Sequence, residues 1–226
     1  MRTQTKDIQN KLTIVKALDI LRDGNYRFVN NLRVNRNLFQ QVNETKEEQY
    51  PFAVILSCID SRTSAELIFD QGLGDVFSIR IAGNVVNPDI LGSMEFASKI
   101  SGSKIIVVLG HTQCGAIKGA CDQLEMGNIT GLLSKIRPAV LSETSIKTDR
   151  TSENPDFVDK VAQINVKRMV NEIPEKSPII KEMIEKKQVG IIGAMYNIAS
   201  GKVEFDEQTA CGNFQFSKVP VVPYAY

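Results

Sequence analysis

Five residues in two short motifs have the types and spacing of a metal-dependent active site. The first motif is Cys58-Ile-Asp60-Ser-Arg62, and the second is His111-Thr-Gln-Cys114. Two thiolates and one imidazole form a donor set that suits Zn²⁺. Three protein ligands would leave a fourth tetrahedral position open, which is typical of catalytic rather than structural zinc sites. The motifs therefore predict that Cys58, His111 and Cys114 bind one zinc ion per chain.

Asp60 and Arg62 complete the predicted chemistry. In an extended segment, residues 58, 60 and 62 point to the same side. An open position on zinc holds water and lowers its pKa, so that hydroxide forms near neutral pH. Asp60 can orient this hydroxide by accepting its hydrogen bond, and Arg62 can pair with Asp60 and keep it ionised. Because two thiolates already cancel the charge of the ion, we expect activity to favour alkaline pH.

Each of these residues alone has a more ordinary interpretation. A buried free cysteine is common as a small hydrophobic residue, and an exposed aspartate–arginine pair contributes little to stability. The two motifs together are a far less probable coincidence, provided that the two loops meet in space, because His111 is the only histidine of the chain. Cys121 and Cys211 have no partner at such a spacing, and we interpret them as structural.

Short apolar runs place both motifs at the ends of buried strands. Four runs lack polar alternation: 52–56, 76–79, 104–109 and 189–195. Such runs favour parallel strands that are covered on both faces. Cys58 follows the first run closely, and His111 follows the third. Because ligands of open α/β sheets bind at the carboxyl ends of strands, adjacent strands would bring the two motifs together.

Helix signals lie between these runs. Asn87-Pro88, Asn154-Pro155 and Ser177-Pro178 each place a capping residue before a proline, which is typical of a helix start. The alternation of strands and helices predicts an α/β fold, with a mainly parallel sheet flanked by helices in a single domain over residues 1–226. Residues 202–205 are expected to add an edge strand.

The two ends of the chain are predicted to lie outside this alternation. Residues 1–48 are expected to form an N-terminal helical arm, in which residues 12–31 have helical spacing. Gly24 weakens that pattern and leaves one helix or two open. Residues 33–49 are polar and are interpreted as a connection, and residues 206–226 as an extended C-terminal tail.

Bulk properties exclude several classes of protein. The 226 residues, 42% of them hydrophobic, suit a single core. The net charge of +1, with interleaved acids and bases, argues against nucleic acid or an anionic membrane surface as a partner. No apolar run approaches the roughly 20 residues of a membrane span, and the polar N-terminus lacks the apolar region of a signal peptide. We therefore expect a cytoplasmic protein.

These motifs make the sequence resemble the β-class carbonic anhydrases. The resemblance is strongest over residues 51–122 and extends more loosely over residues 12–205. Its most specific pieces are Cys58-Ile-Asp-Ser-Arg62, Arg80-Ile-Ala-Gly-Asn84 and His111-Thr-Gln-Cys-Gly115. It implies reversible hydration of carbon dioxide to bicarbonate and a proton, by attack of zinc-bound hydroxide, with Asp60 and Arg62 as the catalytic pair.

The resemblance also implies a substrate pocket and an assembly. The Gly115 N–H would help to orient the substrate. Gln49, Phe77 and Phe96, with Ala82 beside them, would form an apolar CO₂ pocket at a dimer interface. Many relatives have tyrosine where Phe96 stands, so that hydroxyl is missing here. Family members form dimers, often paired into tetramers, with N-terminal helices that embrace the neighbour, and we expect a homodimer or homotetramer.

Two other functions stay open at this point. A hydrolase of carbonyl sulfide or carbon disulfide would use the same scaffold and the same nucleophile, and would differ only in access to the pocket. A non-catalytic zinc or redox module would use the cysteines without turnover. Such a module should have a fourth protein ligand near the other three and would not need the Asp60–Arg62 pair.

Overall fold

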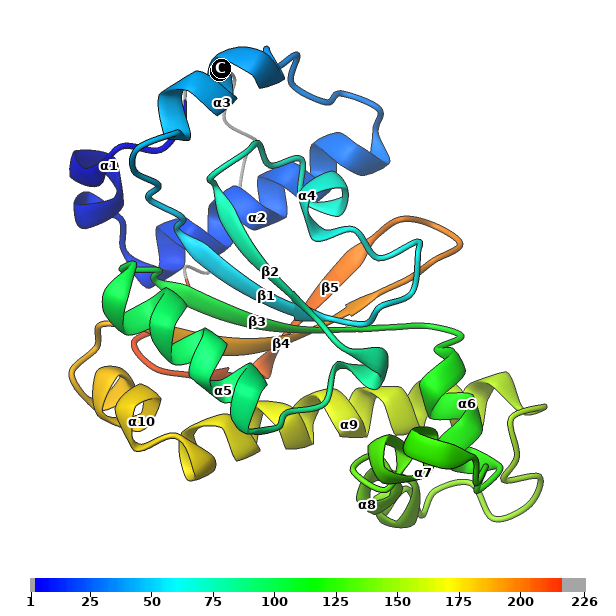
Figure 1. The fold of residues 1–226 in the computed structure, drawn as a ribbon. Coiled ribbons are helices and arrows are strands. Elements are labelled where there is room, and N and C mark those ends of the chain that lie inside the picture. The colour runs from blue at the N-terminus through cyan, green and yellow to red at the C-terminus, as the bar shows by residue number, and fades with distance from the viewer. Residues whose placement is uncertain (1–2, 217–226) are drawn as a thin grey trace.

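Five strands form one sheet at the centre of the chain, for which the computed structural model describes residues 3–216 (Figure 1). The strands are β1 (Ala53–Ser57), β2 (Val76–Arg80), β3 (Ile105–His111), β4 (Gly190–Tyr196) and β5 (Val203–Cys211). Their order is β2-β1-β3-β4-β5; the first four are parallel, and β5 runs antiparallel to β4. The predicted mainly parallel sheet is confirmed.

The last strand is longer than the sequence indicated. It extends from Val203 to Cys211, six residues into the segment that was expected to be a tail. Most residues of β5 are more exposed than those of its neighbour β4. The sequence of β5 therefore lacks the continuous apolar run that marks a buried strand. Residues 212–216 follow β5 without helix or strand, and residues 217–226 of the predicted tail lie outside the described residues.

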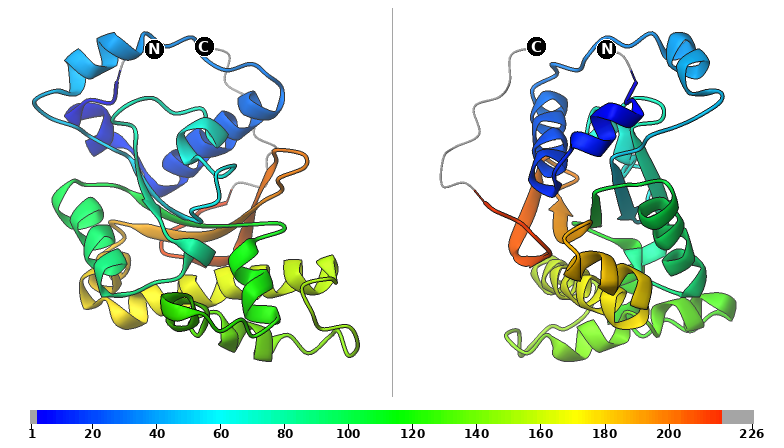
Figure 2. Two further views of the ribbon diagram at one scale, coloured as in Figure 1. Left: turned by 45° about the vertical axis from the view of Figure 1, so that its right-hand side comes forward. Right: turned by 90° about the vertical axis from the view of Figure 1, so that its left-hand side faces the viewer.

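Successive residues of the three central strands β1, β3 and β4 point into two different cores. On β1, Ala53 and Ile55 pack with α2 (Ile14–Val29) and α4 (Ala65–Ile68). Val54 and Leu56 pack with α5 (Pro88–Glu95), α9 (Pro155–Lys176) and α10 (Pro178–Glu185) on the opposite face. Figures 1 and 2 show these two helical layers on either side of the sheet. Burial on both faces explains why β1, β3 and β4 are unbroken apolar runs, whereas the edge strand β2 is only partly buried, so the prediction of a buried strand at residues 76–79 is wrong.

Short helices complete the chain. They are α1 (Lys6–Lys11), α3 (Leu38–Thr45), α6 (Gly115–Cys121), α7 (Gly127–Leu133) and α8 (Arg137–Ser142), with a 3₁₀ turn η1 (Ala82–Asn84) and a π-helical turn η2 (Phe96–Ile100). The three predicted helix starts are confirmed, because the side chains of Asn87, Asn154 and Ser177 accept backbone N–H groups at the first turns of α5, α9 and α10. Within residues 3–216, no helix combines the length and apolar character needed to cross a bilayer.

Gly24 does not divide the N-terminal helix, and α2 runs unbroken from Ile14 to Val29. A Cβ atom at Gly24 would lie 1.8 Å from the carbonyl oxygen of Phe69, so glycine allows α2 to approach the end of α4 closely. Leu18 and Leu21 of α2 are buried against the chain's own sheet. The helix therefore packs against the sheet of its own chain.

Residues 33–49 are not only a connection, because they contain α3. The side chain of Asn37 accepts the N–H of Gln40 and caps the helix. The buried side chain of Gln41 accepts the N–H of Leu73 at 3.2 Å and fastens the helix to the domain. Tertiary hydrogen bonds of this kind leave no periodic apolar pattern, which is why the prediction failed here.

An ion-pair cluster joins the N-terminal segment to the core. The buried carboxylate of Asp70 accepts hydrogen bonds from Arg27 Nε at 2.6 Å and from Arg36 Nη1 at 2.5 Å. Burial opposes ionisation, yet the two guanidinium groups hold the pKa of Asp70 below its usual value. Charge pairing thus keeps residues 27–36 against α4.

One side chain fixes the position of α9 on the sheet. A Cβ atom at Gly110 of β3 would lie 2.5 Å from Val166 Cγ2, and one at Gly193 of β4 would lie 2.7 Å from Val166 Cγ1. Val166 therefore fits over two glycines on adjacent strands. Any shift of the helix along the sheet would drive this side chain into backbone, so the register of α9 is set.

Candidate metal centre

Three side chains meet where β1 and β3 end. The register pairs Ser57 with Leu109, so Cys58 comes beside the end of β3, which closes with His111. The ligand atoms of Cys58, His111 and Cys114 all lie within 4.8 Å of one another, and all three residues are buried. The condition that the two loops meet in space is fulfilled.

The spacing of these atoms fits a zinc ion. Two sulfurs bound to one tetrahedral zinc at about 2.3 Å each lie about 3.8 Å apart, and the Sγ atoms of Cys58 and Cys114 are 3.9 Å apart. His111 Nδ1 lies 2.9 Å from the carbonyl oxygen of Thr112. A proton on Nδ1 satisfies that contact and leaves the buried, unpartnered Nε2 as the ligand atom.

The two thiols differ in their readiness to ionise. A hydrogen bond from the Cys114 thiol lowers the pKa of Cys58 against the opposing effect of burial, and the Gly83 N–H, 3.4 Å from the sulfur, lowers it further. The same thiol–thiolate contact, together with burial, raises the pKa of Cys114. The contact between the two sulfurs thus favours ionisation of one thiol and opposes ionisation of the other, so the second proton is the harder one to remove. A divalent cation would replace that proton.

A tight turn aligns the second motif. Gln113 has a φ of 58°, a left-handed conformation that reverses the chain between His111 and Cys114. The Gln113 N–H donates to Asp159 Oδ1 at 3.1 Å, and the Thr112 N–H donates to the carbonyl of Tyr196 at 3.0 Å. Cys114 then stands at the N-cap of α6. The turn thereby directs an imidazole and a thiol from consecutive elements to one point.

Asp60 and Arg62 form the predicted two-point ion pair. Arg62 Nε donates to Asp60 Oδ1 at 2.9 Å, and Nη2 donates to Oδ2 at 2.7 Å; the backbone N–H of Arg62 also donates to Oδ1 at 3.0 Å. These hydrogen bonds hold the pKa of Asp60 well below its usual range. The carboxylate is therefore ionised throughout the neutral range and is a pure hydrogen-bond acceptor.

Two further residues hold the backbone of the first motif. Arg80 Nε donates to the carbonyl of Cys58 at 3.1 Å, and Nη2 donates to the carbonyl of Asp60 at 2.6 Å. The hydroxyl of the buried Thr63 lies 2.9 Å and 2.8 Å from the same two oxygens. Sequence reasoning did not assign this role to Arg80 or Thr63, although Arg80 opens the second of the quoted motifs.

An apolar cavity of about 410 Å³ opens beside the cluster. Four of the site residues predicted from the sequence line this cavity: Cys58, Asp60, Ala82 and Gly115. Its remaining wall is apolar and comes mainly from α6 and α7: Ile59, Ala116, Leu124, Ile129, Leu132 and Leu133. The sequence analysis missed this wall, because it attached no role to the apolar residues between 124 and 133.

The other predicted pocket residues lie elsewhere in the single chain. Gln49 is exposed and precedes β1, at the opposite end of the strand from Cys58. Phe77 and Phe96 line a separate hollow along β2 and α5, and Phe96 is 55% exposed. One chain therefore does not bring these three residues to the metal cluster, and their role in a pocket remains a prediction about a second copy.

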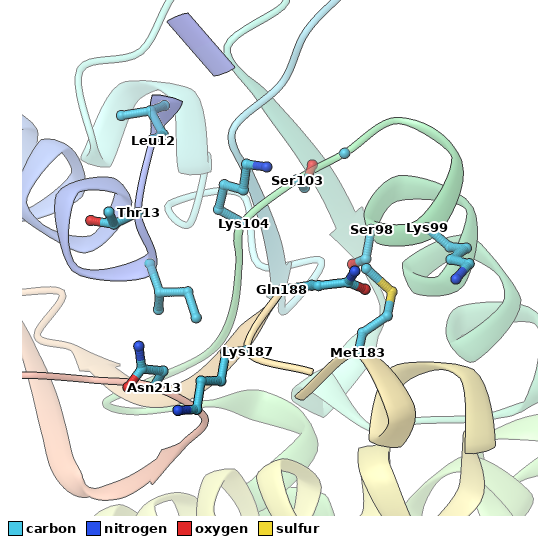
Figure 3. Close-up of a pocket in the computed structure, with 12 residues that line it drawn as sticks. Leu12, Thr13, Ser98, Lys99, Ser103, Lys104, Met183, Lys187, Gln188 and Asn213 are labelled. Atoms are coloured by element: carbon cyan, nitrogen blue, oxygen red, sulfur yellow. The ribbon is translucent and has the colours of Figure 1, made fainter. Parts of the chain in front are cut away.

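A second pocket, of about 470 Å³, lies at the opposite end of the sheet and has a different character. Lys99, Lys104 and Lys187 line it together with hydroxyl and amide side chains. Figure 3 shows the three lysine side chains pointing in different directions. The pocket thus presents no convergent set of charges, in contrast to the cluster around Cys58.

Comparison with known proteins decides the family. The carbonic anhydrase family model matches residues 53–203. A carbonic anhydrase of Mycolicibacterium smegmatis is 34% identical over 197 residues, which cover 84% of this chain and 92% of that protein. This chain belongs to the β-class carbonic anhydrases. Carbonic anhydrase 2 of Mycobacterium tuberculosis is 35% identical over 196 residues, covering 83% of this chain and 90% of that protein.

Solved β-carbonic anhydrases share the fold. The Coccomyxa β-carbonic anhydrase in complex with acetazolamide superimposes with a TM-score of 0.64 at 25% identity, covering 72% of this chain and 74% of that one. A tetrameric β-carbonic anhydrase from Sordaria macrospora gives a TM-score of 0.65 at 24% identity, covering 74% of this chain and 89% of that one. The predicted α/β class is confirmed.

Membership of the β-carbonic anhydrases favours carbon dioxide hydration over the open alternatives. The reaction is the reversible hydration of carbon dioxide, so the chain is an enzyme rather than a non-catalytic zinc or redox module. Among residues 3–216, the cluster holds three possible metal ligands and no fourth cysteine, histidine or acidic side chain joins it. A structural zinc module would require that fourth ligand.

Proposed function

We propose that Cys58, His111 and Cys114 hold one zinc ion, and that Asp60 and Arg62 form the catalytic pair in the hydration of carbon dioxide. The observation that carries this assignment is the buried cluster of three ligand atoms, within 4.8 Å of one another, beside a cavity that Asp60 also lines. When bound, zinc supplies the Lewis acidity that makes water a nucleophile near neutral pH.

Asp60 acts as the acceptor that orients the attacking oxygen. In the reaction, water forms a new bond from its oxygen to the carbon of CO₂, an electron pair of one C=O bond moves onto oxygen, and one proton leaves. Asp60 accepts the O–H of the attacking group, which turns a lone pair toward carbon. Arg62 fixes the carboxylate in advance through the two hydrogen bonds at 2.9 and 2.7 Å, so no reorganisation is needed during attack.

The apolar wall suits a substrate without net charge. Ala82 leaves space beside Cys58, and Leu132 and Leu133 present hydrocarbon to the same cavity. Gly115 is the first residue of α6, where helix geometry leaves the N–H without a partner in the helix. We assign this N–H to a substrate oxygen. Bicarbonate, which is charged, is then held less favourably than carbon dioxide by the apolar surface and leaves.

A second copy of the chain completes the pocket in this proposal. Gln49, Phe77 and Phe96 lie away from the metal cluster of their own chain, so a role in substrate binding requires a homodimer or a homotetramer. The solved relative from Sordaria macrospora is described as tetrameric, which supports this assembly. A reducing cytoplasm is the compartment that suits thiolate ligands.

Removal and return of the metal test the assignment. Protein stripped with a chelator should show a carbon dioxide hydration rate close to the uncatalysed one, and one equivalent of Zn²⁺ per chain should restore it. Initial rates by stopped flow with a pH indicator measure the reaction, and the metal content is read in parallel. Undiminished hydration by fully stripped protein would refute a role for zinc, and refilling with Mg²⁺ provides the control, since hard oxygen-seeking ions do not suit thiolates.

The release of the proton should depend on the buffer. His111 is the only histidine and is assigned to the metal, so no histidine can relay a proton at neutral pH. Asp60 is a poor relay, because its pKa lies well below its usual range. We therefore expect kcat to rise with the concentration of imidazole buffer, while kcat/KM for carbon dioxide hardly changes.

The measurement is a buffer series at constant pH and ionic strength. Proton release follows the attack on carbon dioxide. Buffer should therefore affect kcat, which includes proton release, and not kcat/KM. A kcat that stays constant from low to high imidazole would show that another group of the chain carries the proton, or that another step limits turnover.

A further inference from the structure

A chain of two hydrogen bonds leads from the interior of α9 to a metal ligand. The side-chain amide of Asn165 donates from Nδ2 to the carbonyl of Gly83 at 2.9 Å. The N–H of Gly83 in turn lies 3.4 Å from Cys58 Sγ and donates to it. Gly83 links the two residues, and it belongs to the turn η1 beside the cluster.

The conformation at Gly83 leaves this turn little freedom. Its φ of 68° lies in the left-handed region, and a Cβ atom there would come within 2.6 Å of Ile136 Cδ1. Glycine tolerates left-handed φ values but does not prefer them over others. A contact from outside the turn must therefore favour this conformation of Gly83, and the amide of Asn165 provides it by binding the Gly83 carbonyl.

Asn165 is itself held in place. It precedes Val166, which fits over Gly110 and Gly193 and so sets the register of α9 on the sheet. Asn165 is fully buried in the apolar face of that helix. The position of its amide relative to Gly83 is thus determined by packing against two strands, one of which ends in His111.

Stability alone is a poor explanation for an asparagine here. Its Oδ1 is buried and has no hydrogen-bond partner in the described part of the chain. A buried polar atom without a partner destabilises the folded state, whereas an apolar residue at this position would extend the core formed by Val161, Ala162 and Met169. Core packing therefore does not explain why an asparagine that bonds to Gly83 occupies this position.

We propose that Asn165 is a positioning residue for the metal centre, which holds Gly83 so that its N–H donates to the sulfur of Cys58. This inference rests on the proposed function, in which Cys58 is a metal ligand. An N–H···S bond stabilises a buried thiolate and withdraws electron density from it, and partners of this kind orient metal ligands and tune the metal. Loss of this N–H···S hydrogen bond should weaken metal binding and raise the energy of the lone-pair electrons on the Cys58 sulfur.

Cobalt substitution gives a readout besides activity. Co²⁺ bound to thiolate has a sulfur-to-metal charge-transfer band, whose energy depends on the electron density of the sulfur. In Asn165→Leu, which fills the volume but donates no hydrogen bond, we expect this band to move to longer wavelength. The affinity for Co²⁺, measured by competition with a chelator, should fall about 10- to 100-fold.

The control is a second buried asparagine far from the site. Asn25 of α2 donates from Nδ2 to the carbonyls of Ile68 and Gly201, so Asn25→Leu also removes hydrogen bonds from a buried helix residue to backbone. It should lower the melting temperature but leave the cobalt band and the affinity unchanged. Asn165→Ala, which cannot clash with its surroundings, repeats the test if the leucine variant is not folded.

The cobalt experiments distinguish an error in the role of Asn165 from an error in the metal assignment. If the unmodified protein binds Co²⁺ without a thiolate charge-transfer band, the metal assignment itself is wrong. If the unmodified protein has the band, but folded Asn165→Leu or Asn165→Ala retains its wavelength and the original affinity, Asn165 is only a structural residue and the inference is overturned.

Discussion

Cys114→Ala protein should purify with most of its zinc missing and should hydrate carbon dioxide at close to the uncatalysed rate. The substitution removes one of three protein ligands and leaves the Cys58 thiolate and the His111 imidazole to hold the ion alone. Zinc contributes several kcal/mol of transition-state stabilisation in such enzymes. At about 1.4 kcal/mol per factor of ten, its loss predicts a fall in kcat/KM of at least roughly 1,000-fold.

Cys121→Ala is the matched control for this experiment. Cys121 is also buried, on the same helix that Cys114 caps, and burial raises the pKa of its thiol to about 11, so it is a neutral core residue. This variant should retain one zinc per chain and nearly full activity. Stoichiometric zinc in Cys114→Ala, measured on folded protein by elemental analysis, would contradict the ligand assignment.

Asp60→Asn should separate metal binding from turnover. The amide keeps the shape of the side chain, and Asp60 is not among the three ligand residues, so we expect the zinc content to stay near one per chain. The orienting acceptor loses its charge, and one of its two hydrogen bonds with the Arg62 guanidinium becomes a contact between donors. Loss of one preorganised polar group of this kind typically lowers kcat about 10²- to 10³-fold.

The comparison variant for this pair is Asp19→Asn. Asp19 lies on α2, with Arg22 Nη1 at 3.9 Å, and is remote from the metal cluster, so its removal should leave both zinc content and kcat unchanged. The kcat of Arg62→Lys should lie between those of Asp60→Asn and Asp19→Asn, because an ammonium group cannot reproduce the two parallel hydrogen bonds. Near-normal kcat in folded, zinc-loaded Asp60→Asn would reduce the pair to a structural role.

The strands and the metal cluster were predictable because their signals are local. The three central strands lie between two helical layers, so their sequences are continuous apolar runs, and ligand residues stand at the ends of two of them, β1 and β3. The proline-containing helix starts are equally local, since the cap and the proline are adjacent in sequence. Parallel neighbours and the position of ligands at strand ends then bring Cys58 close to His111 by a general rule.

What escaped prediction depends on contacts that are distant in sequence. α3 is held by Asn37 at its start and by the contact of Gln41 with Leu73, neither of which produces an apolar stripe. The antiparallel β5 is partly exposed and pairs with β4 through a register shift. Asn165 carries one signal that could have been used, a polar residue inside the buried stripe of a long helix.

The positions of the three ligands also bear on how the chain folds. Cys58 and Cys114 are 56 residues apart in sequence and lie just beyond the ends of two adjacent central strands. In the proposed metal site, a single ion that joins them would act as a removable cross-link between β1 and β3. By the chain-entropy relation used for disulfides, a link across a loop of this length restricts the unfolded chain by about 4 kcal/mol. With zinc bound as proposed, the order of the sheet centre would be coupled to the concentration of free zinc, and a chain that folds without the ion would begin with β1 and β3 joined only by their hydrogen bonds.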